Sequence, residues 1–122
     1  MQPLNVVLLQ NDSGVAQALV SALASSASVR QVKSLGELRH SIAKHVTGVA
    51  ILDMEAASMS DVEHLSREFP KARIVCTHRL ADDNMWTAAL NAGAADVCPP
   101  SDTRGIVRAA LGNADMKQSA AA

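Results

Sequence analysis

Short apolar runs of two kinds alternate along this chain. Runs of the first kind are mostly apolar and end in polar residues, as strands do when both faces of their sheet are covered. Five such runs predict strands, at 5–9, 29–32, 49–52, 73–76 and 96–98. Because the run 29–32 is only weakly apolar, we expect that strand at an outer position of the sheet.

Between these runs, apolar residues recur every three or four positions, which is the spacing of one helical face. Five stretches show this spacing, at 15–23, 38–46, 60–65, 85–90 and 106–111. The stretch 60–65 predicts a shortened helix, because Pro70 follows it and the residue before a proline disfavours helical conformation.

Helix-capping residues flank these stretches. Ser34 with Glu37, and Ser60 with Glu63, stand at the spacing of a capping box, and Gly93 is placed to end a helix in the left-handed conformation. Further residues suited to N-cap positions are Asp12, Ser13, Asp82, Asp83, Ser101 and Asp102. Gly48 and Gly112 are expected to end the second and the last helix.

Strands that alternate with helices favour right-handed crossovers, and hence a parallel sheet with helices on both faces. The expected architecture is an α/β fold, a three-layer flavodoxin-like sandwich with five helices and a five-stranded parallel sheet in the order 2-1-3-4-5. We expect residues 1–112 to form this one domain and residues 113–122 to be a flexible tail.

Composition narrows the functions open to such a domain. The formal net charge is -1, so the chain offers no basic surface for nucleic acid or an anionic membrane. No apolar stretch approaches the roughly 20 residues that cross a bilayer, and the N-terminal residues lack the basic region of a secretory signal. We therefore expect a cytoplasmic protein that binds neither nucleic acid nor membrane.

The two aromatic residues, Trp86 and Phe69, leave the core to Val, Leu, Ile, Met and Ala. Trp86 is expected in that core, or alternatively in an exposed patch for a partner on the fourth helix. Three histidines on predicted helices are expected at the surface: His40, His45 and His64. Cys76 and Cys98 are expected to be buried free thiols; a metal or redox pair is the alternative if their strands are neighbours.

Polar residues follow three of the predicted strands, and they define a candidate site. Asp53 ends the third strand, Gln10, Asn11 and Asp12 follow the first, and Thr77 ends the fourth. In an open parallel sheet, ligands gather beyond the carboxyl ends of the strands. A carboxylate there can accept a phosphoryl group if a divalent cation neutralises the charge, so Asp53 is the candidate nucleophile. Asp12 and the neighbouring amide oxygens are candidate ligands for the cation, and Thr77 is a candidate hydroxyl donor.

At these positions the chain resembles the receiver domains of response regulators, the CheY-like family of two-component signalling, from Val6 to Leu111. Asp53 stands where the family has its phospho-acceptor, and Thr77 where it has its switch Ser or Thr. The segment 91–96 is similar to the family's Gly-Ala turn before the fifth strand. The resemblance implies an Mg²⁺ site formed by Asp12, Asn11, Asp53 and the backbone carbonyl of Glu55.

The chain departs from the family pattern at the residues that carry the chemistry. The family's acidic pair aligns with Gln10 and Asn11, which weakens the implied Mg²⁺ site because amides replace carboxylates. The family's Lys-Pro dipeptide corresponds to the segment with Pro99 and Pro100, which has no lysine. Two further departures are His78, which follows the switch residue, and Val97, which occupies the aromatic switch position. Arg79 or Arg104 is a candidate to replace the missing lysine.

Two hypotheses follow from this mixed pattern. In the first, the domain is a phosphorelay receiver in which Asp53 is phosphorylated by a histidine kinase or a small phosphodonor. In the second, it is a pseudo-receiver that docks or localises a partner without phosphorylation. In both, the fourth helix, fifth strand and fifth helix bind the partner protein, and a homodimer is left open. Because the chain has no Gly-x-Gly-x-x-Gly sequence and no Tyr to stack a flavin, we expect no organic cofactor and no enzymatic activity.

Overall fold

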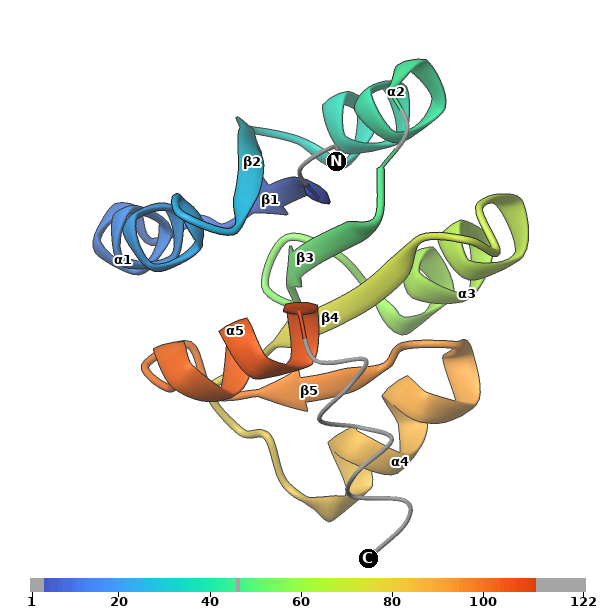
Figure 1. The fold of residues 1–122 in the computed structure, drawn as a ribbon. Helices are drawn as coiled ribbons and strands as arrows, with labels where there is room; N and C mark the ends of the chain where they lie inside the picture. Colours follow the sequence, from blue (N-terminus) through green and yellow to red (C-terminus); the bar gives the residue numbers. More distant parts are fainter. Residues whose placement is uncertain (1–3, 46, 112–122) are drawn as a thin grey trace, which may run out of the picture.

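The computed structural model describes residues 4–45 and 47–111 of the chain, and there strands and helices alternate (Figure 1). The strands are β1 (Leu4–Leu9), β2 (Ala27–Val32), β3 (Val49–Asp53), β4 (Arg73–Thr77) and β5 (Asp96–Cys98). The helices are α1 (Ser13–Leu23), α2 (Leu35–Lys44), α3 (Met59–Glu68), α4 (Asp83–Ala92) and α5 (Thr103–Leu111). Three predicted features, Val46 as part of a helix, Gly112 as a helix end and the tail 113–122, lie outside the described residues.

The five strands form one parallel sheet in the order β2-β1-β3-β4-β5, which confirms the predicted topology. The strand β2 is at one edge, as its weak apolar pattern predicted, although it begins two residues earlier than expected, at Ala27. Asp53 of β3 pairs in register with Thr77 of β4, which in turn pairs with Cys98 of β5. The carboxyl ends of the central strands therefore lie side by side.

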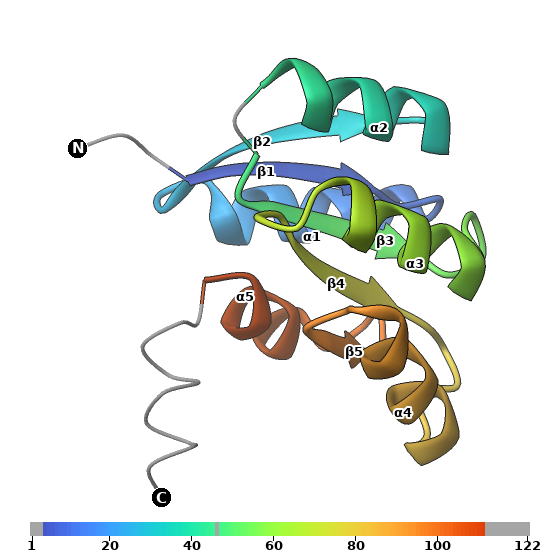
Figure 2. The ribbon, with the colours of Figure 1, turned by 90° about the vertical axis from the view of Figure 1, so that its right-hand side faces the viewer.

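Helices cover both faces of this sheet (Figure 2). Side chains alternate between the faces along each strand, so that Val7 and Leu9 pack with α2, α3 and α4, whereas Val6 and Leu8 pack with α1 and α5. Every residue of β3 is buried, since it is the middle strand. The small side chain of Ala50, fully buried in β3, is typical of this core, which contains almost no aromatic residue.

Helix α3 differs from its prediction in both its start and its length. The capping box is formed by Ser58 and Asp61: the Ser58 Oγ accepts the Asp61 N–H at 3.2 Å, and the Asp61 carboxylate accepts the Ser58 N–H at 2.9 Å. The predicted box of Ser60 and Glu63 was wrong. Because the helix starts at Met59 and runs to Glu68, it has 10 residues, the same length as α2 and α4.

Other predicted caps are present in the structure. Asp12 caps α1, Ser34 caps α2 and Asp82 caps α4, each through a side-chain oxygen that accepts a backbone N–H of the first turn. Asp102 likewise accepts the Gly105 N–H at the start of α5, at 3.0 Å. Gly93 ends α4 with φ at 108°, as its position predicted. At these helix ends, local sequence was sufficient to predict the capping residue.

Trp86 is not a core residue: it is 47% exposed on α4, and its Nε1 donates to Asp96 Oδ1 at 3.2 Å. The expectation of a buried Trp86 was wrong, and its alternative, an exposed position on the fourth helix, is what the structure shows. The indole N–H requires a polar partner, and Asp96 at the start of β5 provides it.

Cys76 and Cys98 are buried free thiols on neighbouring strands, but they lie on opposite faces of the sheet. Cys76 pairs in register with Val97, so the two sulfurs do not form a pair. Burial raises the pKa of both thiols from 9.0 to about 12, and the carboxylates of Asp96 and Asp102 add to the effect at Cys98. Both thiols therefore stay protonated near neutral pH.

Candidate functional site at the carboxyl ends of the strands

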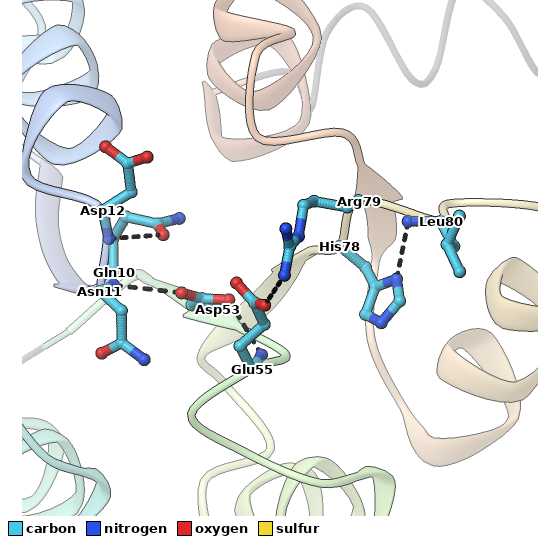
Figure 3. A network of polar contacts seen from close by, with 8 residues as sticks. All are labelled: Gln10, Asn11, Asp12, Asp53, Glu55, His78, Arg79 and Leu80. Atoms are coloured by element: carbon cyan, nitrogen blue, oxygen red, sulfur yellow. Dashed lines mark hydrogen bonds and ion pairs between the residues drawn. The ribbon is translucent and has the colours of Figure 1, made fainter.

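Asp53 is the most buried acidic residue of the described chain, with 3% of its surface exposed. Its Oδ2 accepts the N–H of Asn11 at 3.1 Å, and its Oδ1 accepts the N–H of Glu55 at 2.9 Å (Figure 3). The first bond joins it to the loop after β1, and the second closes the turn that follows β3. Each carboxylate oxygen is therefore held by a fixed backbone donor.

The side chain of Gln10 connects the strands on either side of Asp53. Its Nε2 donates to the Oγ1 of Thr77 at 3.0 Å, and Thr77 is fully buried. Gln10 follows β1 and Thr77 ends β4, so this bond crosses the carboxyl end of β3, which lies between those strands. The other end of the amide, Oε1, accepts the N–H of Asp12 at 3.3 Å. The sequence placed Gln10 at this site, but it did not predict that Gln10 would bind the Thr77 hydroxyl.

The predicted cation ligands lie in the loops after β1 and β3, and their side chains do not converge. Asp12 Oδ1 accepts the N–H groups of Gly14 and Val15, at 2.9 and 3.1 Å, as the cap of α1. In Figure 3 the Asp12 carboxylate and the Asn11 amide point in opposite directions, and neither points toward Asp53. Within residues 4–45 and 47–111, no group of three or more His, Cys, Asp or Glu side chains is placed to hold a metal ion. These donors do not fit a tight Mg²⁺ site, because only Asp53 supplies a carboxylate at its centre.

A cleft of about 360 Å³ opens beside these residues. It is lined by Gln10, Asp12, Val15, Glu55, Arg79, Pro100 and Ser101. Arg79 forms an ion pair with Glu55 across it (Figure 3). A guanidinium is thus present at the site that has no lysine, although a carboxylate already neutralises it. Val15, in the first turn of α1, and Ser101, in the loop after β5, were not predicted here.

The remaining predicted neighbours divide between this cleft and other surfaces. Pro100 lines the cleft, whereas Pro99 is exposed. His78 turns away from Asp53, and its Nδ1 accepts the N–H of Leu80 at 2.9 Å (Figure 3). Arg104 lines a separate hollow beside α5, together with Val107 and Leu111. Arg79 is therefore the cation that the fold brings to the site.

Among the helices of the described residues, none is long and apolar enough to cross a membrane. No protein-family model matches the sequence, and neither does any curated protein. Solved structures do match in fold.

A response regulator from Thermotoga maritima is 16% identical with a TM-score of 0.79, and the match covers 88% of this chain and 93% of that one. A response regulator from Burkholderia pseudomallei, solved with a phosphorylated aspartic acid and a calcium ion, is 21% identical with a TM-score of 0.77, over 98% of this chain and 73% of that one. A CheY-like protein, tadZ, from Pseudomonas aeruginosa is 25% identical with a TM-score of 0.71, over 92% and 96%.

Proposed function

From the receiver-domain fold of this chain and the contacts at its strand ends, we propose a signalling module that binds a partner protein without phosphorylation of Asp53. One observation carries the proposal: the Gln10 amide binds the Thr77 hydroxyl across the end of β3. In a phosphorylation-dependent switch, the unmodified protein samples several positions of that hydroxyl, and phosphorylation of the aspartate favours one of them. Here a permanent side chain does so, and no phosphoryl group is needed.

The charges around Asp53 also favour this proposal. Phosphoryl transfer depends on cations that neutralise the oxygens of the transferring group. Asp53 is the single carboxylate at the centre of the site, the segment of Pro99 and Pro100 has no lysine, and Arg79 is engaged by Glu55. Asp53 and Thr77 are present, while the acidic pair after β1 and the lysine after β5 are replaced by other residues.

The partner is expected on the surface formed by α4, β5 and α5. Trp86 on α4 and Leu80, two residues before the N-cap of that helix, are 47% and 70% exposed. They are the large hydrophobic side chains that the described residues expose, and Trp residues are frequent anchors in protein interfaces. Such a module acts in signalling and not as an enzyme, and we place it in the cytoplasm.

Incubation with Mg²⁺ and acetyl phosphate, followed by intact-protein mass spectrometry, tests this proposal. We expect no phosphoryl adduct, and no change of the amide NMR spectrum in the presence of beryllofluoride. The matched control is Asp53→Asn, which removes the acceptor. An adduct that forms on the wild-type protein and is absent from Asp53→Asn would overturn the proposal.

The second candidate function is phosphotransfer, in which Asp53 accepts a phosphoryl group from a histidine kinase or a small phosphodonor with Mg²⁺. It is favoured by Asp53 and Thr77, which pair in register at the ends of β3 and β4, and by Arg79, which lines the cleft beside them. For this function, Asp53 and the backbone carbonyl of Glu55 would hold the cation, with weak affinity because Asp12 is engaged as a helix cap.

Partner binding separates the two candidates. A partner that is purified with the wild-type protein should be retained equally by Asp53→Asn and lost by Trp86→Ala. If Asp53→Asn loses the partner while it keeps its fold, phosphotransfer is the better explanation. Light scattering of the same samples determines whether a homodimer, left open by the sequence, is the species that binds.

A further inference from the structure

We infer a second docking surface at the free edge of the sheet, where β2 and α2 form a groove that fits an extended acidic peptide of a partner protein. Figure 2 shows α2 lying along β2, which is the outermost strand. We define the β2–α2 groove by Ser28, Arg30 and Val32 of β2, by His40, Ser41 and Lys44 of α2, and by His45, the C-cap of that helix. This surface is distant in the strand order from β5, so it is independent of the proposed partner surface and of Asp53.

The groove follows the strand for most of its length. Two hollows, of about 490 and 220 Å³, share Arg30, Ser41 and His45 as lining residues, and therefore adjoin. Together they run beside residues 28–32 of β2, a length of about 16 Å at the rise of a strand. A groove of that length suits an extended segment of several residues, and a compact anion would fill only a part of it.

The floor of the groove is polar on a sheet face that is otherwise apolar. Arg30 pairs in register with Val7, and Ser28 with Asn5, so both side chains point to the face covered by α2. On that face the inner strands present residues such as Leu9 and Leu52 to the core. Ser28 and Arg30 are exposed at this edge, so their polar atoms are accessible to a ligand, whereas Val32 packs on the core.

Ser41 supplies an independent sign of a missing ligand. The residue is 5% exposed, and its Oγ is buried without a hydrogen-bond partner among the described residues. Such unsatisfied buried groups are rare in folded proteins and call for an explanation. Ser41 is a lining residue of both hollows, so a small movement of its side chain would bring the hydroxyl to a polar group of a bound chain.

The charge of the groove favours an acidic ligand. Arg30 and Lys44 are exposed on the groove and give it a positive charge. The one acid in its lining, Glu37, already accepts the Lys33 N–H at 2.8 Å. An acidic peptide that adds to the edge of β2 would direct every second side chain toward these cations. An antiparallel pair of two β2 strands is disfavoured in the register that sets two copies of Arg30 opposite each other.

The test uses a short capped peptide in which Glu alternates with Val, labelled for fluorescence anisotropy, with amide NMR to locate it. We expect binding at low salt that weakens as salt is added, with shifts centred on residues 28–32 and on Ser41. The double variant Arg30→Glu, Lys44→Glu should weaken binding about tenfold. The matched control, Lys71→Glu with Arg104→Glu, makes the same charge change at exposed positions outside the groove and should leave binding unchanged.

Three results would overturn the inference. The first is the absence of binding, and the second is equal weakening by the groove variant and by its control, which would indicate unspecific charge attraction. The third is an equal response to inorganic phosphate, which would indicate a small-anion site. None of these outcomes depends on phosphorylation of Asp53, so this test and that of the proposed function fail separately.

Discussion

At the scale of single residues, the site is defined by which side chain binds which group. The sequence predicted that Gln10, Asn11, Asp53 and Thr77 would meet at the strand ends, because the end of a strand is visible in the apolar pattern. The pattern does not specify rotamers. It therefore gave no basis to predict that Gln10 would bind Thr77, or that Arg79 and not Arg104 would face Glu55.

Loss of the Thr77 hydroxyl is expected to destabilise the fold. In Thr77→Val the buried bond from Gln10 Nε2 is lost, which costs about 1 kcal/mol in the free energy of unfolding. Urea unfolding measures it. A double-mutant cycle with Gln10→Ala should show coupling, since the two side chains share one bond. Additive effects of the two changes would contradict the role given to this contact.

Alkaline pH is expected to destabilise the protein through its buried thiols. Folding raises the pKa of Cys76 and Cys98 to about 12, so above 9.0 the unfolded chain releases protons that the folded chain retains. The contribution of the two thiols to the free energy of unfolding is therefore fully present below pH 9 and is lost as the pH rises toward 12. Urea unfolding across this range measures it, and Cys76→Ala should show a shallower fall. An equal slope in the variant would assign the effect to other groups.

At the scale of elements, boundaries were predictable wherever a cap depends on neighbours in sequence. Asp12, Ser34 and Asp82 cap the helices that the spacing predicted. The start of α3 was not predictable in this way, because two overlapping Ser-x-x-acid pairs compete there. The pair that begins at Ser58 places Met59 within the helix, where it packs on the core, and this tertiary contact is invisible to local spacing.

The capping box of α3 gives a direct test of that boundary. Ser58→Ala should lower the free energy of unfolding by about 1 kcal/mol, because it removes the acceptor of the Asp61 N–H. Ser60→Ala is the matched control, and should have almost no effect at its exposed position inside the helix. The reverse order of these two effects, in urea unfolding, would restore the boundary expected from the sequence.

The end of α4 is the position where glycine is required. Gly93→Ala is expected to destabilise by at least about 1–2 kcal/mol, because φ is 108° and the new Cβ would lie 2.5 Å from Ser66 Cβ. Gly36→Ala in α2 is the control, since its Cβ would have no neighbour closer than 3.9 Å and should stabilise that helix slightly. Thermal unfolding compares the two; a Gly93→Ala protein as stable as the wild type would contradict the strain.

At the scale of the whole molecule, the fold was predictable because alternating strands and helices admit few topologies. The order of strands, the edge position of β2 and the buried β3 all follow from that alternation and from the apolar pattern. Exposure of single residues was harder to predict: Trp86 sits on the predicted apolar face of α4, yet it extends past the core to Asp96. A helical stripe specifies a direction, and not how deep a large side chain is buried.

Metal binding depends on the whole folded protein, and from the structure we expect a low affinity for Mg²⁺. A ligand that binds the folded state raises the midpoint of thermal unfolding according to its affinity. We expect little rise with millimolar Mg²⁺ for the wild type, because Asp12 is engaged as a helix cap and Glu55 is paired with Arg79, which leaves Asp53 as the carboxylate at the centre of the site. The double variant Gln10→Asp, Asn11→Asp should show a rise, which Asp53→Asn added to it abolishes. A large rise with the wild type would contradict this arrangement of donors.

The position of Trp86 also makes the protein its own optical probe. The chain contains one Trp and no Tyr, so its near-ultraviolet emission arises from a single indole. That indole is half in water and hydrogen-bonded to Asp96, at the junction of α4 and β5. Its emission wavelength and lifetime will therefore respond to anything that covers this junction, while binding at β2 should leave them unchanged. The emission wavelength of an unlabelled sample therefore distinguishes binding at the α4–β5 junction from binding at β2.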